Sequence, residues 1–264
     1  MRKLNSKHKQ AFLDYLSTDK TSNTYILGNF YKYGLKSKDV DFYVEVCFDD
    51  SSIECVLMRY FNDFVFFTTK TLSDSALNQI AVKIHSYPFR AISGNDFSMK
   101  QLSKLFENSN TRETILMTLT NIVGGIEDFN CIRKLDTDDF ASLRRLLLKI
   151  DEFEDKYRLN PDNRIIRTLL NDLIYGYFSN DILISSVSIT AISPHSCMLT
   201  DICVDKDYRG KGISRQIVGY VVNMLLSKGI SNVNLYVDNP LAMNAYLKMG
   251  FVCSGKYLIL TQKS

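Results

Sequence analysis

The sequence predicts an α/β fold of the α+β type, with a mixed sheet and helices on both of its faces. Short runs rich in Val, Ile, Phe and Tyr alternate with segments whose apolar residues repeat at helical spacing. A three-stranded meander leads into a strand–helix–strand unit, an order that requires both antiparallel and parallel pairing. The chain has 264 residues, of which 45% are hydrophobic, which is enough for two cores.

In the first half, the sequence pattern predicts two helices and a three-stranded meander, followed by a helix, a strand, a helix and a strand. Ser22 is expected to cap the second helix, and Gly34 is expected to end it. The helices are expected at 6–16, 22–35, 73–85 and 97–107, and the strands at 42–48, 53–60, 64–69, 89–92 and 114–120.

A pair of adjacent glycines, Gly124 and Gly125, is the best candidate for a linker between two domains. Two glycines in a row cost backbone entropy inside a regular element, so they are better suited to a connection. We therefore expect a first domain at 1–125 and a second domain at 126–264.

The second half starts again with a strand and continues with two helices, a strand hairpin and a β-α-β unit. Asp136 or Thr137 is expected to cap the first helix, Pro161 to begin the second, and Gly229 to end the long third helix. The strands are expected at 131–135, 174–178, 182–192, 198–204 and 233–237, the last two helices at 212–227 and 241–249, and a final strand pair from 251 onward.

A glycine-containing loop joins the strand at 198–204 to the long helix. Glycines let a ligand approach the backbone closely, and the N–H groups of a helix start, together with the helix dipole, attract an anion such as a pyrophosphate. The spacing matches neither a P-loop nor a dinucleotide-binding fingerprint. The candidate anion-binding residues are Arg209, Gly210, Lys211, Gly212, Ile213 and Ser214.

A second motif follows in the run DNPLAMNAYLKMGF, which has the form N-x-x-A-x-x-x-Y-x-x-x-G-F. Its matching residues are Asn239, Ala242, Tyr246, Gly250 and Phe251. With these two motifs, residues from about 132 to 260 resemble the GNAT superfamily of N-acetyltransferases. One departure is Ser214, at a loop position that is usually Gly or Ala in that superfamily.

The resemblance implies a V-shaped opening between the strands at 198–204 and 233–237, which splay because a bulge interrupts their pairing. Pantetheine would lie in the opening along the backbone of Ile202, Cys203 and Val204. The pyrophosphate would lie on the loop at 209–214. Asn239 and Ala242 would contact the cofactor arm, and Tyr246 would reach the CoA sulfur.

The activity implied is transfer of an acetyl group from acetyl-CoA to a primary amine by direct attack. A backbone N–H near Ile202 would stabilise the oxyanion, and Tyr246 would protonate the leaving thiolate. Asp201 is the candidate base. The alternatives Glu152, Glu154 and His195 remain open, as does an acyl-enzyme route through Cys203.

The first half has the same order of elements but neither motif, so we expect a degenerate copy of the fold that has lost CoA binding. It would shape the acceptor pocket or support a homodimer. Two other functions remain open for the whole chain: a non-catalytic acyl-CoA-binding regulatory module, or a transferase for another acyl group or a hydroxyl acceptor. The sequence does not define the acceptor.

The composition limits the other partners. A formal charge of +3 predicts neither nucleic acid nor an anionic membrane as the main partner. The six cysteines have no C-x-x-C spacing and the three histidines are far apart, so free thiols and no metal site are expected. The N-terminal sixteen residues predict an amphipathic helix and not a signal peptide, and no apolar run is long enough to span a membrane, so a cytoplasmic location is expected.

Overall fold

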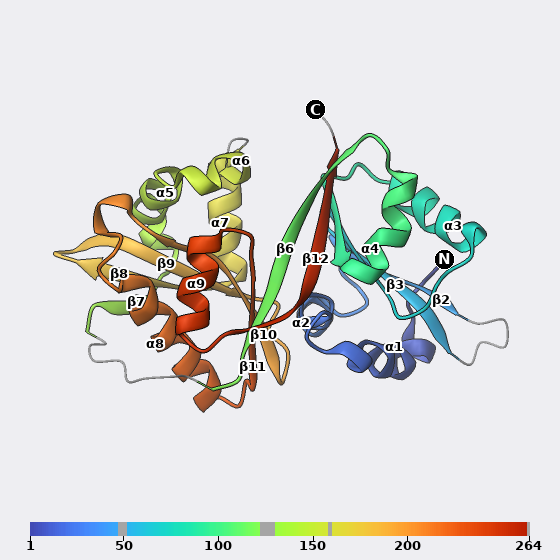
Figure 1. The fold of residues 1–264 in the computed structure, drawn as a ribbon, viewed down its shortest axis with the longest axis horizontal. Coiled ribbons are helices and arrows are strands. Elements are labelled where there is room, and N and C mark those ends of the chain that lie inside the picture. The colour runs from blue at the N-terminus through green and yellow to red at the C-terminus, as the bar shows by residue number, and fades with distance from the viewer. Residues whose placement is uncertain (47–51, 122–129, 158–159, 263–264) are drawn as a thin grey trace.

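The computed structural model describes residues 1–46, 52–121, 130–157 and 160–262. The Gly124–Gly125 linker, Cys47 and the end of the strand expected at 42–48 lie outside the described residues. Figure 1 shows two halves, with strands from both of them meeting in the middle of the molecule. None of the helices in the described ranges is long and apolar enough to cross a membrane.

The elements of the first half follow the predicted order. Its strands are β1 (Arg2–Lys3), β2 (Val40–Val46), β3 (Ile53–Tyr60), β4 (Asp63–Thr68), β5 (Ala91–Asn95) and β6 (Ser109–Leu119). Its helices are α1 (Lys9–Leu16), α2 (Thr24–Tyr33), α3 (Asp74–His85) and α4 (Asp96–Leu102).

The second half repeats this order, with one additional short helix after its first helix. Its strands are β7 (Ile132–Lys134), β8 (Leu173–Ser179), β9 (Ile182–Thr190), β10 (Ser196–Val204), β11 (Asn232–Val237) and β12 (Val252–Gln262). Its helices are α5 (Phe140–Leu148), α6 (Glu154–Tyr157), α7 (Pro161–Asn171), α8 (Ile213–Ser227) and α9 (Pro240–Lys248).

Local chemistry explains several of the boundaries. Gly34 ends α2 with a positive φ of 61°, which glycine adopts without steric cost. Asp136 forms a capping box with Asp139 before α5, so two backbone N–H groups are satisfied at once. Asn180 and Asp181 both have positive φ and turn the chain between β8 and β9.

Two expectations about the elements are wrong. Helix α2 begins after Asn23, one residue beyond the expected cap Ser22. The final strand pair expected from residue 251 is the single long strand β12, with a bulge between Cys253 and Gly255. Strand β12 forms its backbone hydrogen bonds with β5 on one side and β6 on the other, so it has no free edge for a second strand of a hairpin.

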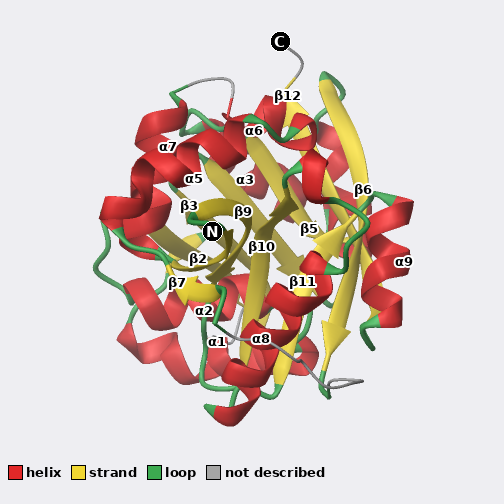
Figure 2. Cartoon of the chain, turned by 90° about the vertical axis from the view of Figure 1, so that its left-hand side faces the viewer, coloured by secondary structure: helices red, strands yellow, loops and turns green. Residues whose placement is uncertain are grey.

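Helices cover both faces of the sheet in each half (Figure 2). In the second half, α8 and α9 pack on one face around Ile217, Val221 and Phe251. On the opposite face, α5 and α7 pack around Leu147 and Ile165. In the first half, α1 and α2 share one buried cluster with the sheet, and α3 and α4 share another.

The two halves exchange their last strands. In the described residues, twelve strands form one sheet in the order β1-β2-β3-β4-β5-β12-β6-β11-β10-β9-β8-β7. Strand β6 of the first half pairs with β11 of the second, and β12 of the second half pairs with β5 of the first. The boundary between 1–125 and 126–264 stays a prediction, and the sheet itself is continuous across the two halves.

Candidate functional site

Strands β10 and β11 run parallel and separate partway along their length. They pair from Ser196 with Asn232 to Leu199 with Leu235, and the register ends there. The rest of β10 continues along β9, while β11 continues along β6 as far as Val237. The opening expected between 198–204 and 233–237 is therefore present.

A β-bulge lies at the point of separation. The pairing of β10 with β9 shifts between Thr200 and Cys203, and Asp201 inside this interval has a φ of 50°. Such a bulge leaves an extra residue outside the ladder and re-aims the backbone N–H groups around it. Ile202, expected to supply an oxyanion-binding N–H, lies in the bulge and is half-buried.

Asp201 accepts a hydrogen bond at the bulge from Tyr157, whose hydroxyl oxygen lies 3.1 Å from Oδ2 of the carboxylate. Tyr157 is the last residue of α6 and is buried. Burial and then the charge of Asp201 raise the pKa of Tyr157, so its hydroxyl stays protonated at neutral pH. Tyr157 is not among the residues predicted from the sequence, because nothing local in IDEFEDKY indicates that its side chain reaches a strand residue 44 positions away.

The loop after β10 presents an uncapped helix N-terminus. Gly210 and Gly212 have φ of 79° and 77°, a region that costs other residues strain. Gly212 is the N-cap of α8, where no side chain caps the first N–H groups and no acidic residue lies in the first turn. Lys211 lies over the ring of Tyr208 at 4.9 Å, Ile213 is buried and Ser214 is half-buried. This arrangement fits an anionic ligand.

Two residues between α5 and α6, Lys149 and Glu152, form ion pairs with the loop after β10. Lys149 lies 2.8 Å from both carboxylate oxygens of Asp205 and 2.7 Å from Asp207. Burial alone would raise the pKa of Asp205, but the hydrogen bonds from Lys149 hold it below its ordinary value. Arg209 forms a bidentate pair with Glu152 at 3.1 and 3.0 Å, and its Nε donates to the Val204 carbonyl.

The same contacts bear on the candidate bases. Hydrogen bonds from Arg209 lower the pKa of Glu152, so its carboxylate is ionised and already paired. Glu154 is exposed at the start of α6. His195 is exposed just before β10 begins, whereas the bulge lies near the other end of that strand. Of the four candidates, Asp201 is the one at the opening.

Helix α9 carries the second motif across the sheet from α5. Asn239 caps the helix, and its side-chain oxygen accepts from the N–H groups of Leu241 and Ala242 at 2.9 and 3.3 Å. Ala242 is half-buried against the core. Tyr246 is 7% exposed and packs on Phe251, with ring centroids 5.6 Å apart. Burial, and then the electrostatic interaction with Cys203, raise the pKa of Tyr246.

Cys203 is buried on the strand beside the bulge. Its Sγ lies 3.3 Å from Ser186 Oγ, and its carbonyl accepts from Ser185 Oγ at 2.6 Å. Burial raises the pKa of the Cys203 thiol to about 12. The thiolate is the nucleophilic form, so the acyl-enzyme route through Cys203 is disfavoured at neutral pH.

The corresponding place in the first half is closed. Strands β4 and β5 pair in parallel only from Asp63 to Val65, and beyond this Ser98 of α4 bridges to β4. Its Oγ lies 2.9 Å from the Thr68 N–H nitrogen and 3.2 Å from the Thr68 carbonyl oxygen. A Cβ at Gly94 would lie 2.3 Å from the Phe66 carbonyl oxygen, so the backbones are already in contact.

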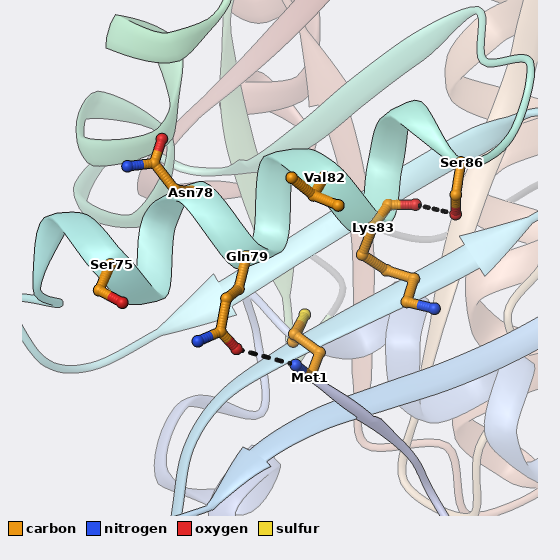
Figure 3. A pocket seen from close by; sticks show the side chains of 7 residues that line it. All are labelled: Met1, Ser75, Asn78, Gln79, Val82, Lys83 and Ser86. Carbon is orange, nitrogen blue, oxygen red and sulfur yellow. Dashed lines mark hydrogen bonds between the residues drawn. The ribbon is translucent and has the colours of Figure 1, made fainter.

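A surface hollow lies far from this opening, on the outer side of α3 (Figure 3). It is lined by residues such as Gln79, Val82 and Lys83, together with Met1, whose amino group donates to Gln79. It contains no residue of either motif, and its side chains provide no acid–base pair. Among the described residues, no group of His, Cys, Asp and Glu could hold a metal ion.

Known proteins are similar to this chain over part of its sequence and in its fold. Residues 136–251 match the acetyltransferase (GNAT) family. A Drosophila protein is similar over 99% of this chain and 98% of its own, with a TM-score of 0.71 and 12% identity. A GCN5-related N-acetyltransferase-like protein from Streptococcus suis is similar over 98% of this chain and 100% of its own, with a TM-score of 0.60 and 14% identity.

A GCN5-related N-acetyltransferase from Sphaerobacter thermophilus is similar over 98% of this chain and 93% of its own, with a TM-score of 0.59 and 13% identity. At these identities the likeness concerns the fold. Because it extends over nearly the whole chain, it includes the first half, which has neither motif.

Proposed function

We propose that the protein transfers an acetyl group from acetyl-CoA to a primary amine, because residues 136–251 match the acetyltransferase (GNAT) family. One observation carries the proposal. Strands β10 and β11 separate at the bulge, and nine residues after Cys203 the chain reaches Gly212, the uncapped N-terminus of α8. An extended pantetheine arm and a pyrophosphate need these two features side by side.

The described residues fit this donor. Backbone groups of Ile202, Cys203 and Val204 are proposed to pair with the pantetheine arm, and N–H groups of the 209–214 loop to bind the pyrophosphate. Asn239 uses its side-chain oxygen as a helix cap, so its NH₂ group is the part that can donate to the arm. When bound, acetyl-CoA supplies an activated thioester.

The transfer balances without any other reactant. The amine nitrogen forms a bond to the acetyl carbon, and the carbon–sulfur bond breaks. The amine loses one proton and the sulfur gains one, giving an amide and a free thiol. Asp201, directly or through a water molecule, is the proposed acceptor of the amine proton, and the Ile202 N–H is the proposed donor to the oxyanion.

Tyr246 is proposed to assist the departing sulfur mainly as a hydrogen-bond donor. A cysteine-like thiol has a pKa of about 8.5, and tyrosine has an ordinary value of about 10. Burial raises the pKa of Tyr246 further, so complete transfer of its proton to a thiolate is unfavourable. A protonated phenol can still stabilise the thiolate, and solvent can then supply the proton.

Calorimetry with acetyl-CoA tests the donor, and thiol release with a panel of amines tests the reaction. Micromolar binding together with thiol release in the presence of an amine is the expected result. Binding without release would favour a regulatory acyl-CoA-binding module. Release only with propionyl- or succinyl-CoA would change the donor, and absence of any binding would refute the proposal.

A further inference from the structure

A chain of buried hydrogen bonds joins the two halves near the point where β10 and β11 separate. Asn234 of β11 is fully buried and lies opposite Thr118 of β6, whose hydroxyl donates to the Asn234 side-chain oxygen at 2.7 Å. The Asn234 side-chain NH₂ donates to Thr24 Oγ1 of α2 at 3.0 Å, and the Thr24 hydroxyl donates to the Lys20 carbonyl at 3.1 Å. Two elements of the first half therefore hold one side chain of the second.

The same side chain also reaches β10. Asn234 Nδ2 lies 3.4 Å from the carbonyl oxygen of Cys197. In the parallel pairing Asn234 lies opposite Met198, and the pairing ends at the next pair, Leu199 with Leu235. The Asn234 carboxamide therefore connects β10 and β11 over the last stretch in which they are paired, on the face of the sheet where α2 lies.

A second contact places α2 at the same end of the opening (Figure 1). Gly28 of α2 lies so close to the second half that a Cβ there would be 1.9 Å from the Ala191 carbonyl oxygen. Ala191 has a φ of 51° and follows Thr190, the last residue of β9, which pairs with Met198 of β10. The backbone of α2 thus meets the backbone at the end of β9, independently of the hydrogen bonds of Asn234.

The buried amide makes the position of β11 along β6 specific. Side chains alternate between the two faces of a sheet, so only a shift by two residues would keep the apolar side chains of β11 on their own face. Such a shift toward Leu116 would place Asn234 opposite a side chain without polar atoms, and its buried carboxamide would lose its partners. The hydrogen bonds therefore oppose any movement of the point where β10 and β11 separate.

We propose that Asn234 is a positioning residue for the acyl donor. Held by Thr24 and Thr118, it fixes the point where β10 and β11 separate, and thereby the opening in which pantetheine would lie. This inference rests on the proposed function. It gives the first half a supporting role, in which α2 and β6 hold the strands of the donor site. Strands that are already in place bind an extended ligand more tightly, because less order is lost on binding.

Hydrogen exchange of the protein without ligand tests the positioning. Thr24→Val keeps the shape of the side chain and removes its hydroxyl. The backbone N–H groups at 197–199 and 233–235 should then exchange at least about tenfold faster, equivalent to about 1.4 kcal/mol, whereas those of β3 should keep their rates. Thr24→Ser retains the hydroxyl and should exchange like the wild type. Unchanged exchange in Thr24→Val, or an equal rise in β3, would overturn the inference.

Ser254→Ala is the matched control. Ser254 is exposed, and its hydroxyl donates to Thr118 Oγ1 at 2.8 Å, so it belongs to the same chain of hydrogen bonds. It lies on β12, which β6 and β11 separate from β10. Because every hydrogen bond of Asn234 is kept, exchange in β10 and β11 should stay within about twofold of the wild type. An effect as large as that of Thr24→Val would contradict the role of Asn234.

Calorimetry with acetyl-CoA tests the consequence for the donor. Thr24→Val should bind at least about tenfold more weakly, equivalent to about 1.4 kcal/mol, and Asn234→Ala more weakly still. Thr24→Ser and Ser254→Ala should keep the wild-type affinity. Faster exchange in Thr24→Val with unchanged affinity would overturn the positioning role. Absence of acetyl-CoA binding in the wild type would refute the proposed function, and faster exchange in Thr24→Val would still support the fixed point of strand separation.

Discussion

The two halves of the chain share one order of elements and differ where a ligand would enter between parallel strands. In the second half, β10 and β11 separate and the helix behind them starts at an uncapped glycine. In the first half, Ser73 caps α3 with its side chain, and Asp74 places a negative charge in the first turn. The same N-terminal dipole is therefore available to an anion in one half and already compensated in the other.

A second difference lies in the last helix of each half. Asn95 caps α4 as Asn239 caps α9, so the asparagine is kept in both. Three residues later the second half has Ala242 and the first has Ser98, which fills the place between the strands by bonding to Thr68. Seven residues after the asparagine, Tyr246 corresponds to Leu102, which has no proton to donate. The two halves thus share one order of elements, and few side chains distinguish the separated strands of the second half from the bridged strands of the first.

The largest expected effect comes from placing a negative charge at the N-terminus of α8, as Asp74 does at the N-terminus of α3. Gly212→Asp introduces a carboxylate at the N-terminus of α8 and strains a residue with φ of 77°. Acetyl-CoA binding should weaken at least about 100-fold, or about 2.7 kcal/mol, measured by calorimetry. Gly229→Asp, at the other end of the same helix and also at positive φ, should keep nearly full affinity. Equal losses in both variants would contradict the assignment of the loop.

Replacing Tyr246 by Phe should lower turnover by about 10- to 100-fold, because a hydrogen bond to a charged group contributes about 1.5–3 kcal/mol. Acetyl-CoA affinity should change little, since the ring and its packing on Phe251 remain. The raised pKa keeps the wild-type phenol protonated below about pH 10, so no loss of rate below that pH should come from Tyr246. Unchanged turnover in the variant across pH would remove Tyr246 from the mechanism.

Two single substitutions exchange the alanine of α9 and the serine of α4. A serine at 242 should obstruct the strand separation of the second half, and an alanine at 98 should remove the side chain that bridges the strands of the first half. Ala242→Ser should weaken acetyl-CoA binding by about three- to tenfold, equivalent to about 0.7–1.4 kcal/mol. Ser98→Ala should leave that affinity intact and lower the free energy of unfolding by about 1–3 kcal/mol, because the buried Thr68 backbone loses its partner. Calorimetry and urea unfolding measure the two effects. A loss of affinity in Ser98→Ala would mean that the first half does take part in donor binding.

The smallest expected effect is a gain. Glu152→Gln removes the carboxylate that holds Arg209, so Arg209 becomes more available to a pyrophosphate. Acetyl-CoA should bind about two- to threefold more tightly, a change consistent with an exposed ion pair of less than about 1 kcal/mol. Glu154→Gln removes the same charge two residues away and serves as the control. A fall in turnover of more than tenfold in Glu152→Gln would instead identify Glu152 as the base.

Most elements could be predicted from the sequence because their signals are local. Gly34, Pro161 and Gly229 mark helix ends through their own φ preferences, and the meander and hairpin follow from short apolar runs between turn residues. The two motifs also lie within single loops and helices, which is why the candidate loop and Tyr246 are recognisable without a structure.

The sequence alone determined the order of the elements, the position of the glycine loop and the positions of the second motif's residues along the last helix. Only the tertiary structure decided that β6 and β12 are exchanged, that Tyr157 reaches Asp201, that Glu152 holds Arg209, and that Ser98 closes the first half. The physical reason is range. Capping, φ preference and side-chain periodicity act over a few residues, whereas a strand's partner or a hydrogen bond across 44 residues is chosen by packing that only the complete fold creates.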